Sequence, residues 1–469
     1  MATDCNPQQL EFQGVGRRTV VAAFDGGTLT SDGGLLLLSE VERRRGILRD
    51  FAACFRDQRN PAYVEHSLEE LVRQRVLGLA LAYEDLNDHD ELRTDPLLAT
   101  VVGKADPTGN NRRQEQDRGK PLAGKSTLNR LEWGAVKQDR YRKISVDSQA
   151  VDRFLVETFL STQESAPAQI ILDLDATDDP LHGEQEGRFF HGYYGGYCYL
   201  PLYIFCGSHL LCARLRSSDR DASAGAVTEV ERIVGQIRSR WPEVQIILRA
   251  DSGFAREELM AWCEHHAVDY VFGLARNARL QRALGGEMTQ AREGFESSGE
   301  ATRLFRDFIY QTRKSWSCQR RVVGKAEHLA KGANPRFIVT SLSAESWSAA
   351  ALYEQLYCAR GEMENRIKEQ QMCLFADRTS SHNLASNQLR LWFSSVAYIL
   401  LNELRRLGLQ GTELAQARCD TIRAKLLKIG AQIRVTVRHV WVRLASSYPY
   451  ATLWTQIVGN LRAGPSPVG

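Results

Sequence analysis

The chain has 469 residues, 43% of them apolar and 25% charged, which is an ordinary composition for a soluble globular protein. The length exceeds what a single hydrophobic core usually organises, so we expect two or three domains. The formal net charge of +3 is too small to predict a class of partner by itself.

The sequence predicts neither export nor membrane insertion. Residues 1–14 lack the basic start and apolar core of a signal peptide, and the most apolar helical stretch, 391–401, is too short to span a bilayer. The ten cysteines include no C-x-x-C pair, which argues against a zinc site or a disulfide framework. We therefore expect a cytoplasmic protein with reduced thiols.

Residues 1–165 are expected to form a mainly helical N-terminal region. Residues 66–86 place apolar side chains three and four positions apart, as in a helix with one buried face. The polar stretch 106–125 reads as an exposed loop because glycine, proline and charged residues dominate it.

A short helix is expected over residues 126–137, with Ser126 or Thr127 as its N-terminal cap. A capped helix after a basic loop fits a DNA-reading element, with Lys125 as a contact. It fits an ordinary bundle helix equally well, and periodicity alone does not decide between them.

The character of the sequence changes near residue 168, where a catalytic-core region over 166–279 is expected. Its strands and helices alternate in the order β-β-β-α-β-α-β. Three meandering strands followed by crossover units predict an α/β fold, a mixed sheet with helices on both faces. The expected strands are 168–176, 197–206, 209–216, 244–250 and 269–275, and the expected helices are 224–238 and 256–266.

Three further regions follow. Short strand-like runs separated by glycines and charges predict a β-rich insertion over 280–342. A long helix is expected over 346–372, within a region that spans 343–376. The last region, 377–469, is expected to be helical and basic.

Positive charge gathers in two blocks. Residues 380–469 contain eleven Lys and Arg against three acids, and residues 300–336 contain nine against three. Two separated basic blocks on a nearly neutral chain predict a polyanionic partner. The alternative is that these charges lie on solvated faces of helices and strands.

Acidic residues collect at the ends of two expected strands. Asp173 and Asp175 differ by two positions and so share a strand face, with Asp175 nearer the carboxyl end, and Asp178 and Asp179 follow them. Asp251 directly follows the strand 244–250. Two carboxylates at neighbouring strand ends make a site for a hard cation, although an aspartate after a strand is also a common helix cap.

The long helix carries a polar stripe. Tyr357, Arg360, Glu364, Lys368 and Gln371 are spaced so that a regular helix places them on one face. An aromatic ring, a guanidinium, a carboxylate and an amine on one stripe suit a phosphodiester site, whereas a salt-bridged solvent face is the alternative. Glu362 points away from this face and is expected to be solvated.

These motifs together resemble the bacterial DDE transposases of insertion sequences. The resemblance is carried by Asp175 with its following Ala-Thr, by the Asp-Ser-Gly-Phe that begins at Asp251, and by Tyr357, Arg360 and Glu364 in the spacing Tyr-x2-Arg-x3-Glu. Within that family the chain is most similar to the branch numbered thirteen-eighty, because 83–96 and other segments also look like it. The resemblance spans nearly the whole chain.

The resemblance implies an RNase H-like core interrupted by a β-rich insertion and flanked by helical regions, with residues 1–165 binding DNA. It implies that Asp175, Asp251 and Glu364 hold two Mg²⁺ ions, with Mn²⁺ as an alternative, beside Tyr357, Arg360 and Lys368 as positioning groups. It also implies a cut-and-paste transposase of the nucleoid, in which a homodimer binds the terminal inverted repeats, cleaves double-stranded DNA and joins the 3′ ends to target DNA. One departure is Gln371, where related proteins often have lysine.

Trp316 lies among cations that include Arg320 and Arg321, inside the expected insertion. Such a mixture serves where bases stack on rings while phosphates are neutralised. The resemblance implies that this tryptophan holds a base flipped out near the cut. The alternative is that Trp316 packs under a small sheet.

Two other functions remain open. The sequence DLDAT matches the nucleophile motif of haloacid dehalogenase-like phosphatases, in which Asp173 would attack phosphorus. The other is a transposase-derived DNA-binding protein that has lost catalysis.

Overall fold

The computed structural model describes residues 9–134 and 142–463, and the chain divides into two compact units. The first, here called the terminal unit, combines Met1–Glu132 with Val396–Gly469, and the second, the central unit, comprises Trp133–Ser395. The N-terminal and C-terminal regions of the sequence therefore share one unit, although the sequence predicts them as separate regions.

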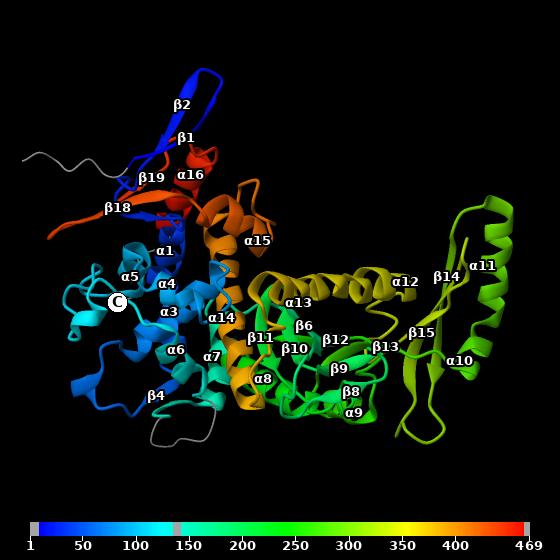
Figure 1. The fold of residues 1–469 in the computed structure, drawn as a ribbon. Coiled ribbons are helices and arrows are strands. Elements are labelled where there is room, and N and C mark those ends of the chain that lie inside the picture. Colours follow the sequence, from blue (N-terminus) through cyan, green and yellow to red (C-terminus); the bar gives the residue numbers. More distant parts are fainter. Residues whose placement is uncertain (1–8, 135–141, 464–469) are drawn as a thin grey trace, which may run out of the picture. The chain divides into compact units, whose positions relative to one another are not determined.

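The terminal unit is mainly helical but also contains two small sheets (Figure 1). Strands β1 (Leu10–Val15) and β2 (Arg18–Ala22) form an antiparallel hairpin. Strands β19 (Val440–Leu444), β18 (Ala431–Val435) and β3 (Leu29–Thr30) form an antiparallel sheet. The expectation that residues 377–469 are helical is wrong for β18 and β19. Their side chains alternate between more buried and more exposed positions, as the side chains of a strand do.

Helix α3 confirms the helix expected within residues 66–86. It spans Leu68–Ala80, and Ser67 and Glu70 form a capping box at its start. Other elements of the unit include α1 (Leu35–Arg45), α2 (Ile47–Ala52), β4 (Phe55–Asp57), α4 (Asp88–Leu92), α5 (Pro96–Val102), α6 (Lys125–Glu132), α15 (Cys419–Ile422) and α16 (Ala451–Arg462).

The expected caps of α6 are wrong. The helix begins at Lys125, so Ser126 and Thr127 lie inside its first turn. The Asp90 carboxylate accepts the Lys125 amide at 3.0 Å, and the Gly124 carbonyl accepts the Thr127 amide at 3.0 Å. A carboxylate from another helix thus satisfies the first amide, which local sequence could not reveal. Residues 135–137 of the expected helix lie outside the described residues.

The central unit contains a nine-stranded mixed sheet. Its strands run in the order β11-β10-β6-β12-β13-β17-β15-β14, with β16 paired to β15. Strands β12 and β13 are parallel to β6 and to each other, whereas β10 pairs with both β6 and β11 in antiparallel fashion. The strands are β6 (Gln169–Ala176), β10 (Leu202–Cys206), β11 (His209–Arg214), β12 (Gln245–Ala250), β13 (Asp269–Leu274), β14 (Thr302–Tyr310), β15 (Arg320–Leu329), β16 (Gly332–Ala333) and β17 (Arg336–Thr340).

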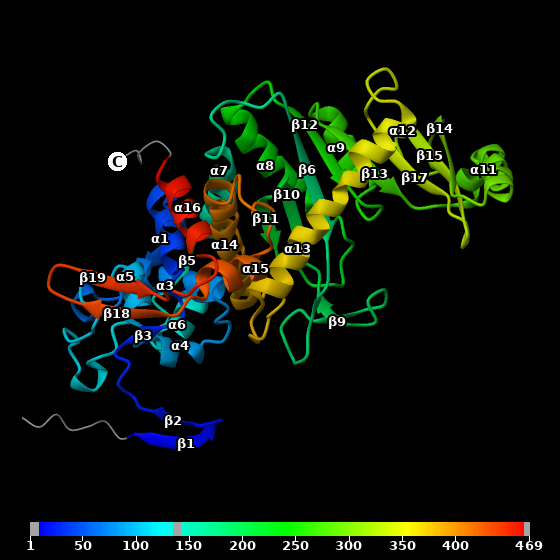
Figure 2. The same cartoon turned by 90° about the horizontal axis from the view of Figure 1, so that it is seen from above.

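Helices cover both faces of the sheet (Figures 1 and 2). On one face, apolar residues of α8 (Ala226–Arg240) and α9 (Glu257–His265) pack against alternate residues of β6 and β12. On the other face, a smaller core includes Ile247 of β12 together with Leu352 and Leu356. Burial on both faces explains why the central strands are almost continuously apolar. Helix α7 (Ser148–Leu160) follows the short strand β5 (Ile144–Val146), and α14 spans Leu384–Gly408.

The strand expected over 197–206 is two strands. Strand β9 (Gly196–Tyr199) pairs with β7 (Asp179–Pro180) and β8 (Phe189–His191) in a separate three-stranded sheet, and β10 begins only at Leu202. Pro201 lies at the break, and proline lacks the amide that a central strand must donate.

The region expected as a β-rich insertion begins with helices. Helix α10 spans Ala278–Ala283 and α11 spans Gly285–Ser298, ahead of β14. Strands β14 to β17 then follow, within the region where short strands are expected. They extend the core sheet because β17 pairs antiparallel with β13.

The helix expected over 346–372 is one helical run of changing pitch. Helix α12 (Ala349–Ala351) passes into a π-helical segment, Leu352–Tyr357, then a 3₁₀ turn, Cys358–Arg360, and then α13 (Gly361–Leu374). A π-helical turn contains more residues than an α-helical one, so it changes the direction of the side chains before it relative to those after it.

Among the described residues, no helix has the length and apolar character needed to cross a membrane.

Candidate active site

Two acidic residues lie at the same end of adjacent parallel strands. Asp175 is the penultimate residue of β6, and Asp251 directly follows β12. The register pairs Ala250 with Leu174, so the next residues on the two strands are Asp251 and Asp175. The Asp251 carboxylate accepts the Gly253 amide at 2.9 Å, which holds the chain in the turn that follows the strand.

The Asp173 carboxylate is engaged in a buried ion pair. Arg249, its register partner on β12, donates to both carboxylate oxygens, at 2.5 and 2.8 Å, and also to the Leu356 carbonyl at 2.6 Å. Both side chains are less than 10% exposed. Burial raises the pKa of Asp173, and the Arg249 guanidinium opposes that rise. This pair links two sheet strands to the π-helical segment, so Asp173 is a structural residue here.

The helical run supplies Tyr357, Arg360 and Glu364. The Arg360 guanidinium lies 2.6 Å from a Glu364 oxygen and 3.8 Å from an Asp175 oxygen, and therefore connects the helix to β6. Burial lowers the pKa of Arg360, but the surrounding acidic groups, led by Asp175 and Glu364, together raise it by more, so the guanidinium stays charged. Burial also raises the pKa of the Tyr357 phenol.

Several of these residues line one open pocket of about 940 Å³ in the central unit, but Asp173 and Tyr357 are not among them. Asp175, Asp251 and Glu364 all line it, together with Arg360 and Lys368. Burial raises the pKa of Asp175 to about 7; Arg360 opposes this rise, and the nearby Asp251 and Glu364 carboxylates add to it. The pocket thus concentrates negative charge that its own cations only partly neutralise.

The polar stripe expected on the helix is partly found at the pocket. Arg360, Glu364, Lys368 and Gln371 line it, whereas Tyr357 does not. Lys368 is exposed, and Gln371 donates to the Asp178 carbonyl at 3.1 Å and to the Asp179 carboxylate at 2.9 Å. Glu362 is exposed and is not among the lining residues, as its offset predicts. Burial raises the pKa of Asp179 to about 8.

Gly273 belongs to none of the sequence motifs above, although the position of Tyr357 depends on it. A Cβ atom at this position of β13 would lie 2.6 Å from the Tyr357 hydroxyl and 2.9 Å from the Ser252 amide nitrogen. Glycine is therefore required for Tyr357 to approach the strand ends. An isolated glycine inside an apolar strand is the sequence signal that points to such a close approach.

The donor set suits a hard divalent cation because all three acids are carboxylates on one pocket. As the side chains stand, no three His, Cys, Asp or Glu groups among the described residues lie close enough together to enclose a metal ion. Arg360 lies between two of the acids instead, at the distances given above.

Trp316, Arg320 and Arg321 do not line this pocket. Trp316 is 6% exposed, belongs to the main core, and packs edge-on against Tyr310 with ring centroids 5.7 Å apart. Arg320 is held 2.6 Å from both Glu257 and Glu264, and Arg321 binds Asp307 at 2.7 Å. A base could stack on Trp316 only if the ring left this packing.

Lys125, the remaining candidate contact, belongs to the terminal unit. Its side chain is half exposed and lies 3.3 Å from Asp90. An exposed ion pair of this kind contributes little to stability. Because the side chain is half exposed, the amine is accessible to solvent.

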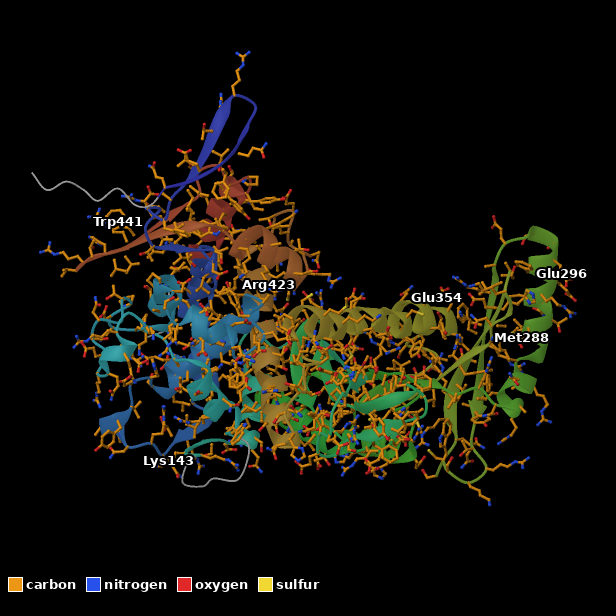
Figure 3. All side chains as sticks on the ribbon, viewed as in Figure 1. Lys143, Met288, Glu296, Glu354, Arg423 and Trp441 are labelled. Atoms are coloured by element: carbon orange, nitrogen blue, oxygen red, sulfur yellow. The ribbon has the colours of Figure 1, made fainter. Side chains whose placement is uncertain are left out.

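We expect Trp316→Ala to destabilise the protein by about 3–5 kcal/mol, because it removes a large buried side chain and leaves a cavity. Urea-induced unfolding followed by circular dichroism measures the loss. Trp441→Ala is the matched control: this tryptophan is 52% exposed on β19 (Figure 3), and we expect its loss to change stability by less than about 0.5 kcal/mol. Equal stabilities of the two variants would contradict the packing role.

The comparisons with known proteins identify the class of protein as a transposase. The family model for Transposase DDE domain group 1 matches residues 12–466, so the chain belongs to this family of DDE transposases. A search of curated proteins found no match to the chain.

Proposed function

We propose that this protein cleaves the ends of a mobile DNA element by metal-dependent hydrolysis and joins the 3′ ends to target DNA. The observation that carries the proposal is that Asp175, Asp251 and Glu364, the acids singled out from the sequence, line a single pocket. Membership of the DDE transposase family supports the same activity.

The topology of the central sheet supports an RNase H-like core. Numbering the core strands along the chain as β6, β10, β11, β12 and β13 gives the spatial order 3-2-1-4-5, with the first three antiparallel and the last two parallel to the first. The ligand site of such a sheet lies at the carboxyl ends of its parallel strands, where Asp175 and Asp251 are found.

Asp175, Asp251 and Glu364 would hold Mg²⁺, or Mn²⁺ in its place. When bound, two such ions supply activation of the attacking oxygen and stabilisation of the leaving oxygen. Arg360 and Lys368 would hold backbone phosphates at the pocket, as charged donors do. Tyr357, whose raised pKa keeps its phenol protonated, would orient Arg360 and the strand ends and would not act as a nucleophile.

A cleavage assay tests this proposal. Duplex DNA from either side of the gene, labelled at one end, is incubated with purified protein and Mg²⁺, and the cut positions are mapped. We expect cuts at defined positions that disappear with EDTA. Uncut DNA under conditions in which the protein binds it would contradict catalysis and favour the alternative of a DNA-binding protein that has lost activity.

The phosphatase alternative finds less support. It requires Asp173 to attack phosphorus, but Arg249 occupies both oxygens of that carboxylate in a buried pair. A nucleophile of this class must be open to its substrate.

The β18–β19 hairpin is the better candidate of the two basic blocks for DNA contact. In the block 300–336, ion pairs neutralise five of the cations. Arg306 and Arg320 pair with Glu287 and Glu257 from outside the block. Asp307 and Glu327, within the block, pair with Arg303, Arg321 and Lys325. On the hairpin, Arg434 and Arg443 are exposed and lie beside Trp441 and Gln432 through the cross-strand register, and Arg438 lies at the turn. None of these three arginines has an ion-pair partner among the residues that the structure describes. A two-stranded ribbon fits a DNA groove.

We expect Arg434→Glu and Arg438→Glu each to weaken DNA binding and to reduce the salt dependence of the affinity by about one counterion. Affinities for a duplex are measured over a series of salt concentrations. Arg292→Glu is the control, because Arg292 is an exposed residue of α11 outside both basic blocks. An unchanged salt slope in both hairpin variants would remove the hairpin from the proposed DNA surface.

The proposal includes a homodimer that pairs two element ends. Sedimentation of the protein with and without end DNA tests it, since a dimer formed around DNA doubles the protein mass in the complex.

A further inference from the structure

An unusual group of aromatic side chains surrounds the turn between β8 and β9, here called the aromatic hairpin (residues 189–197). Tyr193 is 86% exposed and Tyr194 is 38% exposed. Phe189, Phe190 and Tyr197 on the two strands are each about half exposed. Soluble proteins rarely expose a cluster of large aromatic rings unless that surface binds a partner or ligand.

The sequence GYYGG fixes the shape of this turn. The Gly195 amide donates to the His191 carbonyl at 2.9 Å, and Gly195 has a φ of +69°, which favours glycine. Added Cβ atoms at Gly192, Gly195 and Gly196 would meet nothing within 4 Å, so the turn stands clear of other segments. Figure 2 shows β9 and its neighbouring loops beyond the ends of the large sheet's strands.

The tip of the hairpin belongs to the acidic pocket. Tyr193 and Tyr194 line it together with His191, on the same cavity as the three acids. The Tyr194 ring lies edge-on to Tyr193, with centroids 5.0 Å apart, and 4.9 Å from the His191 ring. Burial raises the pKa of Tyr194 to about 12, and the nearby Asp178 and Asp175 carboxylates add to the rise. Its hydroxyl therefore remains a protonated donor at neutral pH.

Two cations complete this side of the pocket. Arg220 and Lys368 both line it and are both exposed. Within the described ranges neither has an ion-pair partner, in contrast to Arg360. Exposed rings beside unpaired cations are the combination that binds single-stranded nucleic acid, in which bases stack on rings and phosphates meet positive charge.

We propose that Tyr193 and Tyr194 are the stacking platform for an unpaired base of the DNA strand whose phosphate enters the acidic pocket, with Arg220 and Lys368 on the flanking phosphates. This inference rests on the proposed function. A base inside a duplex has both faces covered by its neighbours, so a ring at the pocket can stack only on a base that has left the helix. Trp316, to which the resemblance assigns a base-stacking role, lies in the core instead.

The test compares two synthetic DNAs in EDTA, where no cleavage occurs: a blunt duplex, and the same duplex with a three-nucleotide thymine overhang. We expect the wild-type protein to bind the overhang DNA more tightly. Tyr193→Ala and Tyr194→Ala should each reduce that preference by about 5- to 150-fold, the range expected for the loss of one stacked base, whereas Tyr193→Phe and Tyr194→Phe retain it.

His265→Ala is the control, because His265 is an exposed ring at the end of α9 that does not line the pocket. It should leave the preference unchanged. If the alanine variants of the hairpin keep the wild-type preference, the inference is overturned. A changed oligomeric state with unaltered DNA binding would also overturn it, because the rings would then contact a second protein chain.

The cleavage assay separates this inference from the proposed function. Failure of the wild-type protein to cut DNA contradicts the catalytic proposal but leaves the overhang preference measurable. Normal cutting combined with an unchanged preference in both alanine variants contradicts only the stacking platform.

Discussion

We expect Asp175→Asn, Asp251→Asn and Glu364→Gln each to reduce DNA cleavage by roughly 10²- to 10³-fold or more, while binding to the same DNA is retained. The reason is that each substitution keeps the size of the side chain but removes a charge that holds metal at the pocket. Binding is retained because loss of a negative charge does not weaken contact with a polyanion. Cleavage is measured under single-turnover conditions, and binding is measured separately in EDTA.

Glu362→Gln is the matched control for this series. Glu362 lies two residues before Glu364 on the same helix, is exposed, and does not line the pocket. We expect its cleavage rate to equal that of the unmodified protein. An inactive Glu362→Gln protein together with an active Glu364→Gln protein would show that the acid has been assigned to the wrong helical position.

We expect Asp173→Ala to lower the free energy of unfolding by about 3–5 kcal/mol. The substitution leaves the Arg249 guanidinium buried without its carboxylate partner, and breaking a buried pair from one side is strongly destabilising. The Leu356 carbonyl alone cannot neutralise the charge. Urea-induced unfolding followed by circular dichroism measures the difference.

Two further variants separate the buried charge from side-chain size. Asp173→Leu combined with Arg249→Met removes both charges, and we expect it to recover most of the lost stability. Glu157→Ala breaks an exposed pair with Arg240 at 2.7 Å, and we expect it to cost less than about 1 kcal/mol. If Asp173→Ala costs no more than Glu157→Ala, the pair does not hold the strands to the helical segment.

The central strands could be predicted from sequence because burial on both faces makes them apolar and glycine or charge marks their ends. The same pattern placed Asp175 and Asp251 at the carboxyl ends of their strands. The helical offset between Arg360 and Glu364 was also informative, since a separation of four residues brings them together in the structure at 2.6 Å.

Other features depend on contacts between segments that lie far apart in the sequence. The charges near Arg320 indicate a basic surface until Glu257 and Glu264, about sixty residues earlier, are seen to neutralise it. Trp316 has the same neighbours in sequence whether it is exposed or buried. The pitch change over Leu352–Tyr357 likewise has no sequence signal, because π-helical turns depend on packing as well as on composition.

The pairing of β17 with β13 makes the later strands inseparable from the core. Along Val271–Leu274, every residue of β13 has a register partner on β17. The backbone pairing of the sheet therefore continues without a break from the core strands into the segment 280–342. Excision of that segment would strip β13 of a neighbour and leave a row of amide and carbonyl groups open to pairing with other molecules. The segment is therefore part of the core sheet and not a separable module, and we expect changes in its length to fall in the loops that join its strands.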